Sequence, residues 1–228
     1  MKVILFGATG MVGQGVLREC LLAPDVEQVL AVGRSSTGQA HPKLREVIHS
    51  NLMSLAPIEP ELRGYDACFF CLGVSSAGKS EAEYARLTYD LTLAVAEAVA
   101  RLNPKSVFIY VSGAGTDSSE KGGSMWARVK GKTENALLRL PFSSAYMFRP
   151  GLIQPLHGIR SKTRIYQLLY SLFAPLMPLL RAALPDQVTT TEQVGKAMLE
   201  AVRQAPPERV QGPREINALA QGASRGPT

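Results

Sequence analysis

The sequence is poor in the residues that build disulfide scaffolds and zinc sites. It contains three cysteines and three histidines among 228 residues. Cys68 and Cys71 lie in a continuous apolar run typical of a β-strand, in which residues three apart face opposite sides of the sheet. Their thiols would then lie about 10 Å apart, which is too far for a disulfide. We therefore predict buried core thiols and no metal site.

The sequence also lacks a leader-like segment at its start and a basic stripe. Only four apolar residues, Val3 to Phe6, follow Met1 and Lys2 before Gly7 interrupts them, which predicts a cytoplasmic protein. The net charge is +6, from 25 basic and 19 acidic residues, but the basic residues are scattered and not interleaved with aromatic ones. We therefore expect no nucleic-acid partner, and the mildly basic surface suits an anionic cofactor.

Short β-branched or aromatic runs alternate with helical stretches from Lys2 to about Arg149, a pattern typical of βαβ units. The runs are mostly apolar, so we expect their strands to be buried on both faces. Helical periodicity follows the first run as far as Pro24 and recurs over residues 81–102, 124–140 and 191–203. The sequence therefore predicts an α/β fold, a doubly wound parallel sheet of the Rossmann type. The expected strands span residues 3–6, 28–32, 46–49, 67–72, 107–112 and 145–148.

The pattern changes after residue 150. We predict a Rossmann core over residues 1–156, a mainly helical segment over 157–220 that completes the same domain beside the substrate cleft, and a flexible tail over 221–228. Residues 165–184 are apolar but are interrupted by Pro175, Pro178 and Arg181. A lid over the cleft, a dimer face and a peripheral membrane contact are therefore all favoured over a membrane span. Monomer and homodimer both remain open.

Three glycines, Gly7, Gly10 and Gly13, stand between the first predicted strand and an amphipathic helix. In dinucleotide-binding proteins, the first glycine of such a motif allows a tight turn, the second lets the backbone approach the pyrophosphate, and the third lets the helix pack on the strand. The free N–H groups at the helix N-terminus then attract the phosphates. The motif predicts an NAD(P) site whose other contacts in this turn are Thr9, Met11 and Val12.

The end of the second predicted strand bears on the choice of nucleotide. NAD-selective sites place an acidic residue there to accept from the ribose 2′-OH, about 20 positions beyond the motif. This sequence has Arg34 and Ser35 instead. An arginine can pair with a 2′-phosphate and a serine can donate a further hydrogen bond, so the sequence favours NADP over NAD.

The chain resembles the short-chain dehydrogenase/reductase superfamily, in its small atypical branch near the Tat-interactive-protein oxidoreductases and proteins labelled sugar-nucleotide epimerases. The resemblance covers about residues 2–158 and rests on five blocks in a fixed order. The blocks are Gly7–Gly13, Cys71–Gly73, Tyr110–Gly115, Val129–Lys132 and Phe148–Gly151.

The resemblance implies a catalytic serine, tyrosine and lysine, with the tyrosine four residues before the lysine. Ser112 and Lys130 match the serine and the lysine, but Trp126 stands in the tyrosine position. The indole N–H is a donor only and cannot replace a phenol as acid or base. The resemblance further implies cofactor contacts from Leu72, Gly73 and Val74 to the adenosine ribose and pyrophosphate, and from Lys130, Pro150 and Gly151 near the nicotinamide.

Two functions follow from these residues. The first is a hydride-transfer oxidoreductase or epimerase-like enzyme that uses NADP on a small carbonyl compound. The second is a non-catalytic NADPH-binding regulatory or interaction protein, which Trp126 favours because the expected acid–base group is missing. No motif names the substrate.

Overall fold

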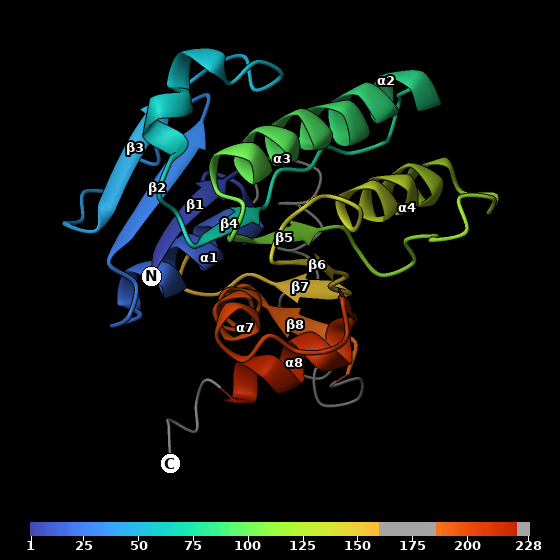
Figure 1. The fold of residues 1–228 in the computed structure, drawn as a ribbon. Helices are drawn as coiled ribbons and strands as arrows, with labels where there is room; N and C mark the ends of the chain where they lie inside the picture. Colours follow the sequence, from blue (N-terminus) through green and yellow to red (C-terminus); the bar gives the residue numbers. More distant parts are fainter. Residues whose placement is uncertain (160–185, 223–228) are drawn as a thin grey trace.

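A seven-stranded sheet forms the centre of the computed structural model, which describes residues 1–159 and 186–222 (Figure 1). All neighbouring strands are parallel, and their order is β3-β2-β1-β4-β5-β6-β9. The chain therefore starts at the middle of the sheet and builds outward in both directions, as in a doubly wound Rossmann fold. The strands are β1 (Lys2–Phe6), β2 (Gln28–Gly33), β3 (Leu44–Ile48), β4 (Ala67–Phe70), β5 (Val107–Val111), β6 (Ser144–Phe148) and β9 (Val210–Gln211).

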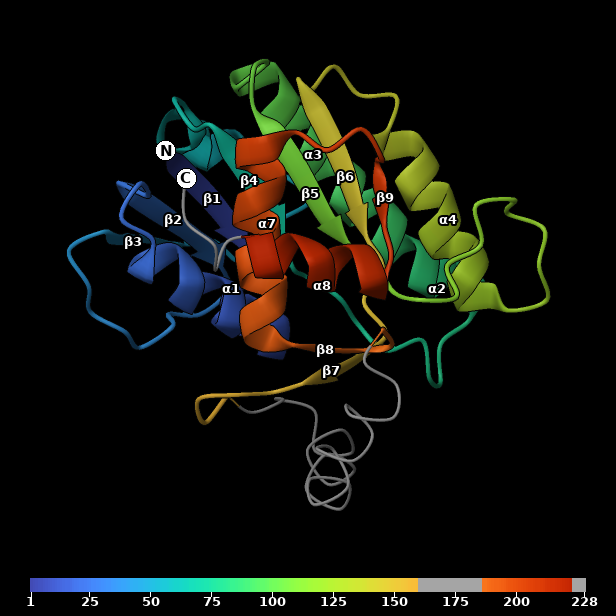
Figure 2. The same ribbon diagram turned by 90° about the horizontal axis from the view of Figure 1, so that it is seen from below.

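Helices cover both faces of this sheet. One face carries α1 (Met11–Leu22), α7 (Thr191–Gln204) and α8 (Pro213–Gly222), as the view in Figure 2 shows. The other face carries the 3-10 helix η1 (Ala56–Leu62), α3 (Leu91–Leu102) and α4 (Met125–Leu137). The short helix α2 (Glu81–Ala85) leads through the π-helical turn η2 (Arg86–Asp90) directly into α3.

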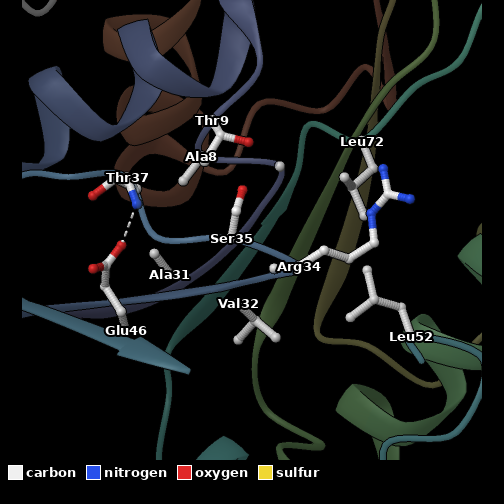
Figure 3. Close-up of a pocket in the computed structure, with 12 residues that line it drawn as sticks. Ala8, Thr9, Ala31, Val32, Arg34, Ser35, Thr37, Glu46, Leu52 and Leu72 are labelled. Carbon is white, nitrogen blue, oxygen red and sulfur yellow. Dashed lines mark hydrogen bonds between the residues drawn. The ribbon is translucent and has the colours of Figure 1, made fainter. Parts of the chain in front are cut away.

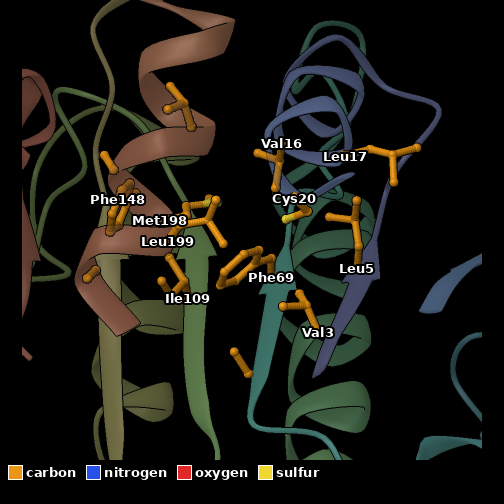
Figure 4. Packing of buried hydrophobic residues seen from close by; sticks show 14 of the residues in the cluster. Val3, Leu5, Val16, Leu17, Cys20, Phe69, Ile109, Phe148, Met198 and Leu199 are labelled. Carbon is orange, nitrogen blue, oxygen red and sulfur yellow. The ribbon is translucent and has the colours of Figure 1, made fainter. Parts of the chain in front are cut away.

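Alternate residues of each strand enter two separate cores, which explains why the strands are apolar throughout. Leu5 and Phe69 pack with α1 and α7 on one face (Figure 4), whereas Phe6 and Phe70 pack with α3 on the other. Cys68 and Cys71 likewise join opposite cores, which is the arrangement that the sequence predicts. Cys68 is buried and Cys71 is partly buried, and burial raises the pKa of both thiols.

The predicted architecture is confirmed, including the uninterrupted helical stretch from Glu81 to Leu102. Three short strands were not predicted: the edge strand β9 and the two strands of a second parallel sheet, β7 (Leu152–Gln154) and β8 (Val188–Thr190). These strands have two or three residues each, too few for a period-two pattern to stand out. The helix α8 was also missed, because Pro213 and the neighbouring glycine resemble a loop.

The C-terminal part of the chain belongs to the same body as the N-terminal part. Met198 of α7 and Ile216 of α8 are fully buried in the core that α1 covers, and β9 extends the main sheet at β6. Gln221 and Gly222, which the sequence assigns to the tail, form the end of α8. Residues 223–228 and the apolar segment 165–184 lie outside the described residues.

Two further observations apply to residues 1–159 and 186–222 alone. None of their helices combines the length and the apolar character that crossing a bilayer requires. No three His, Cys, Asp or Glu side chains among them gather as the ligands of a metal ion would.

Candidate functional site

A cleft of about 720 Å³ opens at the carboxyl edge of the sheet, where the turns after β1, β4, β5 and β6 meet. Ligands of doubly wound folds bind at this edge, where the chain reverses its direction of winding between β1 and β4. The small sheet formed by β7 and β8 lies beyond the same edge (Figure 2). Thirteen of the residues proposed from the sequence line this cleft: Gly7, Thr9, Gly10, Met11, Val12, Arg34, Leu72, Gly73, Val74, Ser112, Lys130, Pro150 and Gly151.

The turn after β1 is built around two glycines that have no room for a side chain. Gly7 has a φ of +87°, and a Cβ there would lie 2.8 Å from the main-chain carbon of Cys71. A Cβ on Gly13 would lie 2.0 Å from the carbonyl oxygen of Gly7. Gly13 does not line the cleft, and it acts as the sequence predicts by letting α1 pack directly on the turn.

The first turn of α1 faces the cleft with its main-chain amides available. Gly10 caps the helix and has no side chain to accept from these amides, and the first turn carries no acidic residue. The donors that Ser, Thr or Asp caps usually satisfy are therefore left for an anion, and the helix dipole adds a partial positive charge. This arrangement of donors fits the diphosphate of a dinucleotide cofactor.

A side pocket of about 130 Å³ adjoins the cleft at the end of β2. Figure 3 shows Ser35 pointing toward the Ala8–Thr9 turn and the side chain of Arg34 extending toward Leu72. Arg34 lines both the pocket and the cleft. An exposed guanidinium at this point can meet a phosphate on the ribose next to the adenine.

The same pocket contains a carboxylate that the sequence analysis missed. Glu46 of β3 lines it because β2 and β3 pair so that Glu46 lies beside Ala31. Sequence reasoning looked for an acidic residue only at the end of β2, and nothing local to Glu46 indicates the register of this pairing. As the sequence indicates, no carboxylate stands at the end of β2, but strand pairing brings one from β3 into the same pocket.

Trp126, Lys130 and Glu134 lie on one face of α4 at intervals of four residues, and this face meets the end of β5. The ammonium group of Lys130 donates a hydrogen bond to the main-chain carbonyl of Ser112. Burial lowers the pKa of Lys130 from 10.5 to about 8, although the charge of Glu134 opposes this shift. Lys130 is thus a partly desolvated cation at the wall of the cleft, beside Trp126.

The hydroxyl of Ser112, the residue whose main-chain carbonyl accepts from Lys130, already makes a hydrogen bond of its own. It donates to Oε1 of Glu134, whose side chain is 1% exposed. Arg149 completes the group: its Nε lies 3.0 and 3.1 Å from the two carboxylate oxygens of Glu134. The buried hydroxyl of Ser112, the buried carboxylate of Glu134 and the partly buried guanidinium of Arg149 therefore join β5, α4 and β6 beside the cleft. The sequence analysis identified Ser112 but neither Glu134 nor Arg149, because their pairing depends on packing between elements.

The tyrosines considered as substitutes for a catalytic phenol lie elsewhere. Tyr84 and Tyr110 are buried, and burial raises the pKa of Tyr110. Tyr89 lies under the ammonium group of Lys132, which is 4.6 Å from the ring centroid. None of the three lines the cleft.

Several main-chain and apolar positions of the cleft were not predicted individually. Gly113 and Ala114 belong to the block Tyr110–Gly115, which carries the family resemblance, but the resemblance assigns a role only to Ser112 within it. Ile153 belongs to the short strand β7, which has no recognisable pattern. The cleft residues outside the predicted set are Cys71, Ser75, Val111, Gly113, Ala114, Trp126 and Ile153.

The chain has relatives of similar length. It is 29% identical over 210 residues to "Protein fmp52, mitochondrial" of Emericella nidulans, which covers 88% of this chain and 86% of that protein. It is 27% identical over 155 residues to "Protein HTATIP2" of Rattus norvegicus, with 67% and 62% covered.

The names of the fungal relatives contradict the cytoplasmic location expected from the sequence. That expectation rested on the short apolar run Val3 to Phe6. This run forms the buried central strand β1, so its composition reflects burial in the core and carries no information on the compartment.

Solved structures show the same fold. The Bordetella bronchiseptica enzyme WbmF, in complex with NAD+, superposes with a TM-score of 0.67 at 13% identity, covering 100% of this chain and 79% of that one. DesIV of Streptomyces venezuelae, a dTDP-glucose 4,6-dehydratase with NAD and TYD bound, gives 0.65 at 17% identity, with 97% and 80% covered. The model of the NAD(P)H-binding family matches residues 7–137, the span from the glycine turn to the end of α4. The chain therefore belongs to the NAD(P)H-binding family, as an atypical short-chain dehydrogenase/reductase with a Rossmann fold.

Proposed function

We propose that the protein is an NADP-dependent oxidoreductase or epimerase-like enzyme that acts on a small carbonyl compound. The observation that carries the proposal is that Lys130 shares one cleft with the glycine turn after β1 and with Arg34. A group able to hold a proton thus stands at one end of the cleft, and groups suited to phosphates stand at the other. A nucleotide spanning the cleft would place its nicotinamide near Lys130, Pro150 and Gly151.

The proposed chemistry assigns one task to the cofactor and the others to the chain. Bound NADPH would supply a hydride to the carbonyl carbon of the substrate. The carbonyl oxygen then requires a proton, and the ammonium group of Lys130 is the proposed donor because its lowered pKa lies near neutrality. Trp126 can hydrogen-bond through its indole N–H or pack on the substrate, but it cannot exchange a proton.

The preference for NADP over NAD rests on Arg34 and Ser35. A guanidinium is always charged and can form two parallel hydrogen bonds to a 2′-phosphate, and the Ser35 hydroxyl can add a third. Isothermal titration of the wild-type protein with NADP+ and with NAD+ tests this choice. We expect tighter binding of NADP+, and equal or weaker binding than that of NAD+ would contradict it.

Turnover is tested by following NADPH oxidation with a panel of aldehydes, ketones and quinones. We expect acceptor-dependent oxidation by the wild type and a fall in kcat of about 10²- to 10⁴-fold in Lys130→Met, which removes the proton donor. Lys132→Met is the matched control, because Lys132 lies on the same helix but contacts Tyr89 outside the cleft. Equal rates for the wild type and Lys130→Met would refute the role of Lys130.

A second candidate function is an NADPH-binding regulatory or interaction protein without turnover. Trp126 favours it, and so does the hydroxyl of Ser112, whose proton is committed to Glu134. The variant Trp126→Tyr separates the two candidates, because it restores the phenol at the position that the family uses. The second candidate would be established if the wild type binds NADPH but does not oxidise it in the presence of any acceptor, while Trp126→Tyr does. An active wild type excludes it.

A further inference from the structure

Glu46 bridges the loop after β2 to the neighbouring strand β3. Its Oε1 accepts a hydrogen bond of 2.7 Å from the main-chain N–H of Thr37, and its Oε2 accepts one of 2.7 Å from the hydroxyl of Ser36. Figure 3 shows the Thr37 contact beside Ser35. The hydroxyl of Ser36 in turn accepts from the N–H of Gly38 at 3.0 Å. One carboxylate therefore fixes the first turn of this loop.

The loop needs such a fixed point because its own sequence does not impose a conformation. Residues 34–40 are all small or polar, and Gly38 has a φ of +73°. Pairing of β2 with β3 ends at Gly33, so the sheet does not hold the residues that follow. Arg34 and Ser35 stand directly between the last sheet residue and the two residues that Glu46 holds.

A carboxylate beside a ribose pocket can act in three ways. It can accept from the ribose 2′-OH and so select NAD, it can repel a 2′-phosphate, or it can hold protein groups that bind this phosphate. In this structure each carboxylate oxygen of Glu46 already accepts from the loop that carries Arg34. Burial raises the pKa of Glu46, but the hydrogen bonds from Thr37 and Ser36 together outweigh this effect and leave the pKa below its usual value. The carboxyl group is therefore ionised at neutral pH.

We propose that Glu46 is a positioning residue for the 2′-phosphate subsite: by holding Ser36 and Thr37, it orients Arg34 and Ser35 toward the phosphate of NADP. This inference rests on the proposed function, in which that subsite binds NADP. Arg34 itself contacts the ligand, whereas Glu46 acts through the loop. Removing Glu46 should therefore weaken NADP binding, although it removes a negative charge from the surroundings of an anion.

Two substitutions separate position from charge. Glu46→Gln keeps the shape: its amide oxygen can still accept from Thr37, and its NH2 group can donate to the Ser36 hydroxyl, which rotates to accept. Glu46→Ala removes both contacts. The dissociation constants of NADP+ and NAD+ are measured for each variant by isothermal titration, with the melting temperature as a check on folding.

We expect Glu46→Ala to weaken NADP+ binding about tenfold, the equivalent of one hydrogen bond to a charged group, while NAD+ binding changes less than about threefold. Glu46→Gln should restore NADP+ affinity to within about threefold of the wild type. In an Arg34→Ala background, Glu46→Ala should have a clearly smaller effect than in the wild type, because only Ser35 is then left for Glu46 to position.

Three results would overturn the proposal. Tighter NADP+ binding by both variants would show that Glu46 repels the phosphate, and a larger loss for NAD+ than for NADP+ would show that it accepts from the ribose. Full additivity with Arg34→Ala would show that it does not act through Arg34. A failure of the proposed function is seen separately, in the wild-type titration: a wild type that prefers NAD+ or binds neither nucleotide removes the subsite and this inference with it.

Discussion

The hydroxyl of Ser112 donates its hydrogen bond to the carboxylate of Glu134, within the packed junction of β5, α4 and β6. A hydroxyl has a single proton, so Ser112 cannot give this hydrogen bond and at the same time donate to a substrate carbonyl. The residue that carries the family resemblance at this position is thus tied into the scaffold. The proton chemistry proposed for the cleft falls to Lys130 instead.

Substitution of Ser112 by alanine tests this assignment. Because the buried carboxylate of Glu134 would lose a donor, we expect Ser112→Ala to lower the free energy of unfolding by about 1–3 kcal/mol. Nucleotide affinity should stay unchanged, and kcat should fall less than about tenfold, well short of the loss expected when an acid–base group is removed. Ser118→Ala is the control, because Ser118 contacts the outer, exposed end of Arg149. A fall in kcat of about a thousandfold without a change in stability would instead make Ser112 a catalytic group.

Breaking the ion pair of Glu134 and Arg149 should lower the free energy of unfolding more than breaking an exposed pair does. Glu134→Gln leaves the guanidinium of Arg149 without its counter-charge in a mostly buried site, which we expect to cost about 3–5 kcal/mol in chemical denaturation. Arg128, which lies on α4 like Glu134, pairs with Glu81 of α2, and Arg128→Ala breaks this pair, in which the glutamate is 51% exposed. Its effect should be much smaller. Similar losses in the two variants would contradict the buried character of the Glu134 pair.

Lys130 makes the stability of the protein depend on pH in an interval that its pKa values define. Its pKa is about 8 in the folded protein and 10.5 when exposed, because burial disfavours the charged form. Between these values the unfolded chain binds the proton more tightly, so the penalty is full below about pH 8 and disappears as the pH rises to 10.5. Relative to Lys130→Met, the wild type should therefore gain stability with rising pH across this interval. Urea unfolding of both proteins at a series of pH values measures the difference, and parallel curves would contradict it.

Gly13 should be intolerant of even a methyl group. A Cβ there would lie 2.0 Å from the carbonyl oxygen of Gly7, so α1 must move away from the turn that faces the cleft. We expect Gly13→Ala to weaken binding of NADP+ and NAD+ alike by at least about tenfold and to lower the melting temperature. Gly123→Ala is the matched control, because no atom lies within 4 Å of its added Cβ. Unchanged affinity in Gly13→Ala would show that the turn does not hold the nucleotide.

The sequence allowed the α/β fold and the glycine turn to be predicted because both depend on neighbouring residues. The apolar runs indicate strands that are buried on both faces of the sheet. Gly7, Gly10 and Gly13 lie close together in the sequence and shape a single turn. The same holds for Trp126 and Lys130, which a helix places on one face at a spacing of four. Because the family resemblance implies a tyrosine four residues before the lysine, the missing phenol could be recognised without a structure.

Other features of the site depend on contacts between segments that are distant in the sequence. Glu46 reaches the pocket at the end of β2 only through the register of β2 with β3, and a shift of one residue would turn it to the other face of the sheet. Glu134 and Arg149 meet Ser112 only when α4 packs against β5 and β6. The sequence by itself thus determined the type of fold and the glycine turn proposed to hold the phosphates. The tertiary structure decided which side chains share a hydrogen bond at the pocket beside β2 and next to Lys130, because strand register and helix packing are non-local.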